Sequence, residues 1–418
     1  MKKALLLGAV ASLAGLCWSD WPQFQGPNRD GVSTETVKLA DTWPEGGPKV
    51  AWKKERMGTG YAGAVIEGRK VYVLDRVNDQ KDTLRCIDLE TGAEDWDYSY
   101  DCPGKYKGNY NGSRNLPAVD AQYVFTLGPF GQLTCVSKET HEAVWQKNIV
   151  EEYGATITNW GLCQSPTMYK DTVIVAPMSD KAGAVAFDKA TGREVWKSER
   201  LGRAKDVLYS WTSPLVATVD GQDMVVVLSC RTDPNLTGID ATNGKGLWNY
   251  RGWKCPNPIA SPIAIPGGRF FVTGGYNSGG ALVKVSKAGD KWNVEEVFNN
   301  KALSSQAQNP IFYKGFIYGN SSGNKAGVEC IDLNGEVKWK TENSDPEEIG
   351  AILIADGKLF SFLSQKGTLR MLAASPDGCK ELTSAKVVGG TENWGVMGYA
   401  DGRLLIRARR VLICLDLR

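Results

Sequence analysis

One arrangement of apolar and polar positions returns along the whole chain. An apolar stretch ends on Asp, a polar turn containing Gly follows, and a second short stretch ends on Trp. The clearest copies are Cys86 to Trp96, Ala186 to Trp196 and Gly238 to Trp248, with looser copies at Cys135 to Trp145, Val285 to Trp292 and Cys330 to Trp339. Each copy predicts a strand, a tight turn and a second strand, because Asp caps turns and Gly relaxes them. Strand pairs spaced by about 40 to 50 residues are typical of β-propeller blades.

Three kinds of landmark give the number of blades, and each is found eight times: the start of an inner strand, the turn, and the end of an outer strand. The inner strands are predicted to begin near Ala64, Ala118, Thr167, Leu215, Ile263, Ile311, Ile352 and Met397. The outer-strand landmarks are Trp52, Trp96, Trp145, Trp196, Trp248, Trp292, Trp339 and Leu382.

The two ends of the chain each carry part of a blade. Lys49–Trp52 is an outer strand with no turn before it, and Val411–Asp416 is a strand with no outer strand after it. We therefore predict an all-β, eight-bladed β-propeller over residues 49–418, closed by pairing of these N- and C-terminal strands. Closure removes exposed strand edges, which would otherwise template aggregation.

The residues between a leader and the first blade, 20–48, carry the large aromatic side chains Trp21, Phe24 and Trp43. A disordered segment is poor in such residues. We expect this segment to pack on the ring, with Trp21 and Phe24 buried.

The repeated Trp residues have a structural explanation. A Trp at the same place in most blades packs between neighbouring blades, and its burial contributes roughly 1.5–3 kcal/mol. This role is predicted for Trp96, Trp145, Trp196, Trp248 and Trp339.

Residues 1–19 predict a signal peptide, because two lysines precede an apolar stretch that is too short to span a bilayer. The protein is thus expected to be periplasmic or secreted. Lipoprotein anchoring at Cys17 is the less favoured alternative, since Leu16 is large where a small residue is expected. Without Lys2 and Lys3 the 49 basic residues become 47, equal to the 47 acidic ones. A neutral surface argues against binding to nucleic acid or to anionic lipid.

Cysteine and histidine usage limits the chemistry. Four cysteines share the position two residues before the turn landmark and are predicted to be free and buried: Cys86, Cys135, Cys330 and Cys414. Pairing among the others stays open: Cys102, Cys163, Cys230, Cys255 and Cys379. After the leader the chain has one histidine, His141, which replaces the turn Gly and should lie on an outer turn. Histidine triads and histidine metal centres therefore lack their key residue.

Aromatic and amide side chains gather in the loops that lead into the inner strands, which we call the inlet loops. In a propeller these loops surround the central funnel. Trp160, Trp211 and Trp394 depart from the outer-strand position, so packing between blades does not explain them. Aromatic faces beside amides and Arg suit a planar or sugar-like ligand or a peptide; alternatively, these side chains fill the channel and bond to one another. The candidate ligand-binding residues are Tyr61, Arg114, Asn159, Trp160, Gln164, Tyr209, Trp211, Asn257, Gln306, Gln308, Glu348, Glu392, Asn393 and Trp394.

The repeated pattern [Ala/Cys/Gly]-x-Asp-x-x-Thr-Gly-x-x-x-Trp is similar to the repeat of the pyrroloquinoline-quinone (PQQ) propellers. That resemblance covers residues 49 to 416 and implies either of two branches. One contains quinoprotein alcohol and sugar dehydrogenases, and the other contains cofactor-free propellers such as the lipoprotein subunit of the outer-membrane β-barrel assembly machinery. The chain has no adjacent cysteine pair, no cytochrome motif and no long inserts. It is thus closer to the cofactor-free branch.

Two functions follow as hypotheses. The first is an exported, non-catalytic binding or scaffold module for a protein, peptide or glycan, with no cofactor and no metal. The alternative is a PQQ- and calcium-dependent dehydrogenase of alcohols or sugars. There, Trp160, Trp211 or Trp394 would stack on the quinone and Arg114 would polarise its oxygens, with Glu348 or Glu392 as calcium ligand. Neither the ligand nor the oligomeric state follows from the sequence.

Overall fold

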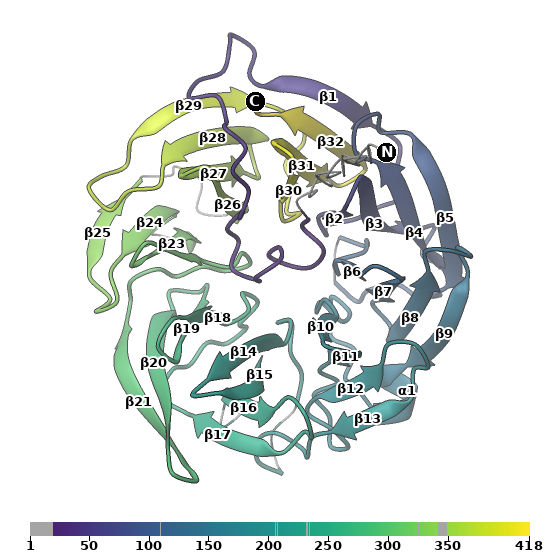
Figure 1. Cartoon of the computed structure of the whole chain (residues 1–418), viewed down its shortest axis with the longest axis vertical. Helices are drawn as coiled ribbons and strands as arrows, with labels where there is room; N and C mark the ends of the chain where they lie inside the picture. Colours follow the sequence, from purple (N-terminus) through teal and green to yellow (C-terminus); the bar gives the residue numbers. More distant parts are fainter. Residues whose placement is uncertain are drawn as a thin grey trace, which may run out of the picture.

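The computed structural model describes residues 20–108, 110–204, 206, 208–230, 233, 235–323, 326–341 and 349–418. The predicted signal peptide, with Cys17, lies outside these residues. Within them, the strands form eight four-stranded antiparallel sheets around a central axis (Figure 1). The prediction of an eight-bladed propeller is confirmed.

Each blade runs outward from its inner strand. The first four blades contain β2 (Val65–Glu67), β3 (Lys70–Val77), β4 (Lys81–Asp88), β5 (Glu94–Asp101); β6 (Ala118–Val119), β7 (Tyr123–Leu127), β8 (Gln132–Ser137), β9 (Ala143–Asn148); β10 (Thr167–Tyr169), β11 (Thr172–Val175), β12 (Val185–Asp188), β13 (Glu194–Lys197); and β14 (Leu215–Val219), β15 (Gln222–Leu228), β16 (Leu236–Asp240), β17 (Gly246–Tyr250). The next three contain β18 (Ile263–Ile265), β19 (Arg269–Gly274), β20 (Gly279–Ala288), β21 (Lys291–Asn300); β22 (Ile311–Tyr313), β23 (Phe316–Ser321), β24 (Gly327–Ile331), β25 (Val337–Lys340); and β26 (Ile352–Ala355), β27 (Lys358–Leu363), β28 (Thr368–Ala373), β29 (Glu381–Lys386). A short helix, α1 (Ile149–Tyr153), follows β9, and among the described residues no helix is long and apolar enough to cross a membrane.

The last blade is completed by the N-terminal strand. It contains β30 (Gly398–Ala400), β31 (Arg403–Ala408), β32 (Val411–Asp416) and, outermost, β1 (Lys49–Lys54). β1 pairs antiparallel with β32, with Lys49 opposite Asp416 and Trp52 opposite Cys414. The ring is therefore closed by the two strands that the sequence analysis paired.

The outer-strand Trp residues tie each blade to the next. The indole N–H donates to a carbonyl in the turn of the following blade: Trp52 to Leu89 (2.7 Å), Trp145 to Lys189 (2.8 Å), Trp196 to Ala241 (2.9 Å) and Trp339 to Ser375 (2.8 Å). Trp248 packs against Phe270 of the next blade, with ring centroids 5.4 Å apart. The predicted packing between blades is confirmed.

The turn Gly lets the Trp ring approach the turn closely. Gly92 has φ +71°, and a Cβ there would lie 2.7 Å from the Trp52 ring. Gly192 meets Trp145 in the same way. Where the chain has His141 instead, φ is +60° and the exposed imidazole stacks on Trp96 at 4.7 Å. His141 thus lies on an outer turn, as expected.

The turn Asp works through its side chain. Asp188 accepts hydrogen bonds from the Thr191 amide (2.9 Å) and hydroxyl (2.8 Å), and these bonds hold its pKa below the usual value. Since a carboxylate that accepts two hydrogen bonds favours its charged form, the Asp188 side chain helps to fix the turn.

All nine cysteines among the described residues are free. Cys86, Cys135, Cys330 and Cys414 are buried, as predicted for their shared position.

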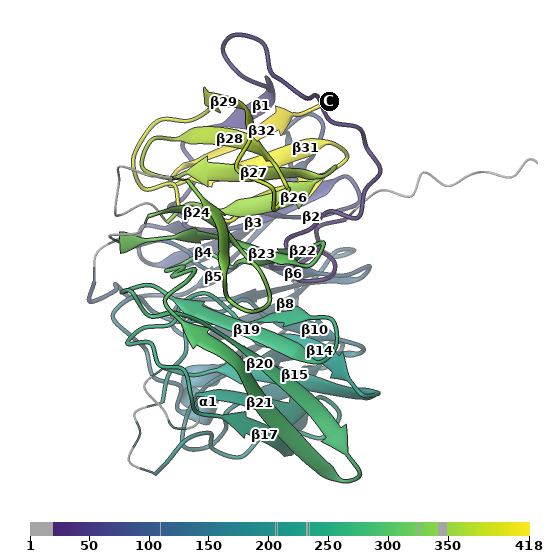
Figure 2. The same ribbon diagram turned by 90° about the vertical axis from the view of Figure 1, so that its left-hand side faces the viewer.

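The N-terminal segment, residues 20–48, crosses the ring at its centre (Figure 1) and lies along one side of it in Figure 2. It binds the turns that follow inner strands: Asp20 accepts from the Gly68 amide (2.7 Å) and Glu35 accepts from the Asp401 amide (2.7 Å). Because inlet loops precede the inner strands, the segment lies at the opposite end of the channel. A parallel bridge joins Val32 to Ile354 of β26.

The aromatic residues of this segment differ in burial. Trp21 is 2% exposed and bridges to Ile66 of β2. Phe24 was expected to be buried, but it is half-buried because it faces the central cavity. The buried Arg29 donates to Thr167 of β10 (3.0 Å), and burial lowers its pKa to about 9.

Candidate functional site

A cavity of about 540 Å³ lies among the inlet loops. Eight of the candidate residues line it: Tyr61, Arg114, Trp160, Trp211, Asn257, Gln306, Gln308 and Trp394. The inlet loops of several blades therefore converge on one site, as the propeller topology predicts.

One wall of the cavity is an aromatic cluster. Tyr61 stacks on Trp394 with ring centroids 5.1 Å apart, and Tyr110 meets Trp394 edge-on at 4.7 Å. The Tyr61 hydroxyl donates to Glu392 (3.1 Å), and burial together with this carboxylate raises the pKa of Tyr61 to about 12. The phenol is thus neutral at ordinary pH and serves as a rigid surface.

Arg114 lies on this cluster. Its guanidinium is 5.0 Å from the Tyr61 ring centroid and 5.4 Å from that of Tyr106, and Nη2 donates to the Tyr110 carbonyl (2.8 Å). The nearby Glu392 lies 3.6 Å from Arg409. Among the described residues, Arg114 has no carboxylate partner of its own, so its charge in the cavity wall is uncompensated.

A second aromatic cluster stands on the loops that lead into β10 and β14. Trp160 meets Trp211 edge-to-face at 5.6 Å, and Tyr209 meets Trp211 at 5.1 Å. The Trp211 indole donates to the Thr158 hydroxyl (2.9 Å), which fixes its ring.

Three aromatic residues expose much of their surface at the cavity: Tyr110 is 40% exposed, Trp160 38% and Tyr276 51%. Within the described residues, these are all of the strongly exposed aromatic side chains, and each lines the same cavity. Large aromatic rings are costly to leave in water, so the exposed apolar surface of the described residues is concentrated at this cavity to an unusual degree for aromatic side chains.

Amide side chains form a further part of the lining. Gln308 is 5% exposed; its Nε2 donates to the Trp394 carbonyl (2.9 Å), whereas its buried Oε1 has no hydrogen-bond partner among the described residues. Asn257 and Gln306 also line the cavity. A buried acceptor without a partner costs free energy.

The serines of the lining belong to the scaffold. Each accepts a hydrogen bond from a backbone amide of the preceding blade's inlet loop: Leu116 to Ser165 (3.0 Å), Ser165 to Ser213 (2.9 Å) and Ser213 to Ser261 (2.9 Å). Asn309 continues the series by accepting from Ser261 (2.8 Å). The Ser-Pro and Asn-Pro pairs thus link consecutive blades around the cavity.

Other candidate residues turn away from the cavity. Gln164 is 1% exposed and pairs with both backbone groups of Ala176 (2.6 and 2.7 Å). The Asn393 amide donates to the Ser364 and Gly390 carbonyls (2.9 and 3.0 Å). These two amides hold their own loops.

The remaining candidates also lie outside the lining. Asn159 is exposed, Tyr209 supports Trp211, and Glu392 supports Tyr61. Glu348 lies outside the described residues.

Among the lining residues that the sequence analysis did not propose are Phe24, Tyr110, Cys163 and Tyr276. Tyr110 lies in an inlet loop that the sequence analysis located, but the residue itself was not among the candidates. Cys163 donates to the Trp160 carbonyl (3.3 Å), and burial raises the pKa of its thiol to about 11. A thiol with such a pKa reacts slowly, which fits a packing role.

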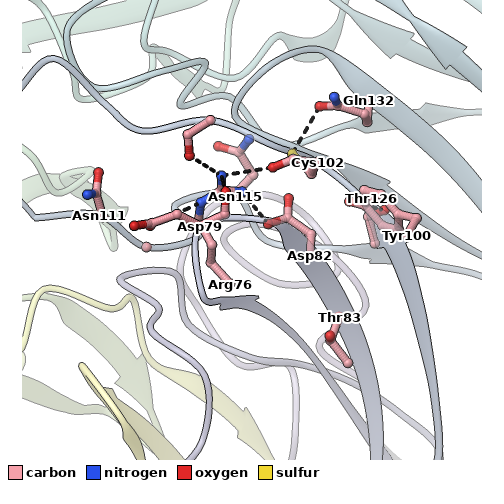
Figure 3. A network of polar contacts seen from close by, with 12 residues as sticks. Arg76, Asp79, Asp82, Thr83, Tyr100, Cys102, Asn111, Asn115, Thr126 and Gln132 are labelled. Carbon is pink, nitrogen blue, oxygen red and sulfur yellow. Dashed lines mark hydrogen bonds and ion pairs between the residues drawn. The ribbon is translucent and has the colours of Figure 1, made fainter.

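A buried polar network is centred on Arg76 and Asp82 (Figure 3). Arg76 donates to Asp82 (2.9 Å) and to the Cys102 carbonyl (2.9 Å), and the Cys102 thiol donates to Gln132 (3.1 Å). The Arg76 guanidinium also lies over the Phe130 ring at 5.1 Å, and Phe130 packs on Tyr106 at 5.8 Å. These contacts connect the network, through Phe130, to the Tyr106 ring beside Arg114.

The dehydrogenase alternative requires a calcium site. Calcium takes oxygen ligands that include carboxylates. The described lining residues offer amides and hydroxyls, and the described residues contain no group of three His, Cys, Asp or Glu side chains able to hold a metal ion. Glu392 is engaged by Tyr61 and Arg409. The described residues thus do not fit a calcium site.

The chain also matches a known protein family in sequence. Residues 80–341, well over half of the 418 residues, match the family described as Outer membrane protein assembly factor BamB. The chain belongs to this family. No curated protein is significantly similar to this BamB-family chain in sequence.

Solved structures share the fold of this BamB-family chain at low identity. BamB from Moraxella catarrhalis has 13% identity and a TM-score of 0.61, covering 88% of this chain and 99% of its own. Quinohemoprotein alcohol dehydrogenase from Comamonas testosteroni has 15% identity and a TM-score of 0.64, covering 95% and 80%. The computationally designed Ika8 protein has 11% identity and a TM-score of 0.58, covering 91% and 100%. At such identities the likeness concerns the fold alone.

Proposed function

We propose that this chain is an exported, non-catalytic propeller that binds a protein, peptide or glycan in the cavity among its inlet loops. One observation carries the proposal: the strongly exposed aromatic side chains of the described residues, Tyr110, Trp160 and Tyr276, all line this cavity. Exposed apolar surface gathered around a concave site with a few polar groups is typical of binding sites.

The scaffold around the cavity is preorganised. The serine series joins consecutive blades, and Trp211 is held by Thr158 (2.9 Å). A site whose side chains are already fixed loses little conformational entropy on binding. A preorganised surface supports ligand recognition, and recognition requires no titratable catalytic side chains.

Export is part of the proposal. Residues 1–19 carry the pattern of a signal peptide, and the family to which the chain belongs is described as an outer membrane protein assembly factor. A location in the cell envelope would place the cavity in reach of periplasmic or extracellular ligands.

The test is a binding survey of the purified protein with peptide and oligosaccharide arrays, followed by calorimetry of the hits. We expect Trp160→Ala to weaken binding at least about tenfold while leaving the melting temperature nearly unchanged, because Trp160 is exposed in the cavity. Trp145→Ala is the matched control. It should lower the melting temperature and leave affinity unchanged, since Trp145 bonds to the next blade.

A titration with PQQ and calcium, with a dye-linked assay on alcohols and sugars, completes the test. We expect neither tight quinone binding nor turnover. Quinone- and calcium-dependent turnover that is lost in Trp394→Ala would overturn the proposal in favour of the dehydrogenase. Absence of any peptide or glycan ligand sensitive to Trp160→Ala would overturn it as well.

A further inference from the structure

We propose that the cavity ligand is an acidic oligosaccharide, with a sugar carboxylate bound by Arg114 and a sugar ring stacked on the exposed aromatic surface. This inference rests on the proposed function and names the chemistry of its ligand.

The charge of the cavity is the first argument. Arg114 is the one charged side chain among the described residues that line the cavity. Its guanidinium lies over the Tyr61 and Tyr106 rings and, among the described residues, donates one hydrogen bond, from Nη2 to the Tyr110 carbonyl. Because Glu392 lies beside Arg409 instead, the guanidinium keeps donors for an incoming anion. Its planar fork fits a carboxylate with two parallel hydrogen bonds.

The amides are the second argument. Gln308 is 5% exposed and lines the cavity, and its buried Oε1 has no hydrogen-bond partner among the described residues. Because this atom is buried, a ligand O–H or N–H would reach it only after the side chain rotates toward the cavity. Asn257 and Gln306 lie in the same lining. An amide presents a donor and an acceptor side by side, which matches two neighbouring hydroxyls of a sugar.

The exposed rings are the third argument. Trp160 and Tyr276 present 38% and 51% of their surfaces. One face of a pyranose ring consists of C–H groups, which pack on the electron-rich face of an aromatic ring. An acidic peptide would instead need pockets for alternate side chains along an extended backbone. A volume of about 540 Å³ lies within the range of small-molecule sites and suits a short saccharide.

The experiment is calorimetry of the purified protein with α-1,4-linked trigalacturonate, with galactotriose as its neutral counterpart and triglutamate as an acidic peptide. We expect trigalacturonate to bind about 10- to 100-fold more tightly than galactotriose, since a charge-assisted hydrogen bond distinguishes them. Arg114→Gln should remove this difference, whereas Trp160→Ala should weaken both sugars.

Arg409→Gln is the matched control, because it removes a neighbouring positive charge that lies outside the described lining. It should leave the preference for the acidic sugar within about twofold. A thermal melt of each variant separates loss of binding from loss of folding.

The outcomes separate the two proposals. Equal binding of acidic and neutral sugars, or a preference that survives Arg114→Gln, overturns the acidic ligand and leaves the binding function standing. Binding of triglutamate without either sugar overturns the oligosaccharide and again keeps the binding module. Binding of none of the three overturns this inference, and the array survey then decides on the binding function by itself.

Discussion

Arg407 of β31 and Asp75 of β3 form an ion pair whose two side chains are fully buried, and this pair joins the last blade to the first. Asp75 also accepts from Arg85 (2.7 Å) and from the Gly58 amide (3.1 Å). Closure of the ring therefore rests on a polar contact inside the channel wall as well as on the pairing of β1 with β32.

Removing one charged partner of this ion pair should strongly destabilise the fold. In Asp75→Asn the buried Arg407 keeps its charge without a carboxylate, and we expect a loss of about 3–5 kcal/mol in the free energy of unfolding, measured by urea titration. Lys53→Gln is the control, because the pair of Lys53 with Glu55 is exposed and should contribute less than about 1 kcal/mol. A loss for Asp75→Asn no larger than that of the control would contradict the role of the pair.

Asp82 should make stability depend on pH. Burial raises its pKa to about 6, although Arg76 opposes the shift. The unfolded value is about 3.9. Between these values the folded state binds more protons, so the free energy of unfolding falls as pH rises from about 4 to about 6, by about 1–3 kcal/mol.

Asp82→Asn should reduce this pH-dependent decrease in the free energy of unfolding, whatever its effect on absolute stability. Asp223→Asn is the comparison, because hydrogen bonds from Thr218 and Tyr169 lower the pKa of Asp223 to about 2 and give the opposite sign. Unfolding curves measured at several pH values check both. The same slope in the wild type and Asp82→Asn would refute the assignment.

The turn glycine and its histidine replacement should respond differently to substitution. Gly92→Ala places a Cβ against the Trp52 ring at φ +71°, and we expect a loss of about 2–4 kcal/mol. His141→Gly removes the left-handed strain but also the stack on Trp96, so the two effects oppose each other and the change should stay within about 1 kcal/mol. Thermal melts of both variants test this, and equal losses would show that the Trp contact does not select Gly.

The serine series should matter for coupling between blades. Ser213→Ala leaves the buried Ser165 amide without its acceptor, and we expect a loss of about 1–3 kcal/mol in denaturant titration. Ser286→Ala, at a half-buried position on β20, should change stability by less than about 0.5 kcal/mol. If the two variants were equally stable, the series would be incidental to the fold.

Removal of residues 20–53 should affect the whole ring. It deletes the N-terminal segment and all of β1 except its last residue. The last blade therefore loses its outer strand, and the contact of Arg29 with Thr167 is removed. We expect the single cooperative melt to be lost or broadened, in calorimetry and in circular dichroism. A truncated protein that melts as sharply as the full chain would show that closure is dispensable.

The fold could be predicted from the sequence because its rule is local and repeated. A turn led by Asp88 or Asp188, followed by Gly and then Trp, specifies two strands and a contact with the next blade, and counting such units gives the ring. The incomplete blades at the two ends then leave one way to close it.

The site could be predicted only in part. The inlet loops were located correctly, and the exposed Trp160 was recognised because it breaks the outer-strand rule. The direction of each amide could not be read from sequence. Gln164 and Gln308 occupy similar loops, yet Gln164 satisfies a nearby backbone pair whereas Gln308 lines the cavity. The position of Phe24 depends on a segment that crosses the ring, which no local pattern reveals.

The course of the N-terminal segment also decides how a ligand reaches the cavity. Phe24 is part of the cavity lining, and the segment that carries it crosses the end of the ring opposite the inlet loops (Figure 1). Under the proposed function, this segment would hinder a polymer from threading through the channel, so a polymer would offer a free end or a side branch at the inlet mouth and leave by the same mouth. Affinity should stop rising once the few units nearest that end fill the cavity, and longer chains would be held by one terminus with their remainder in solvent.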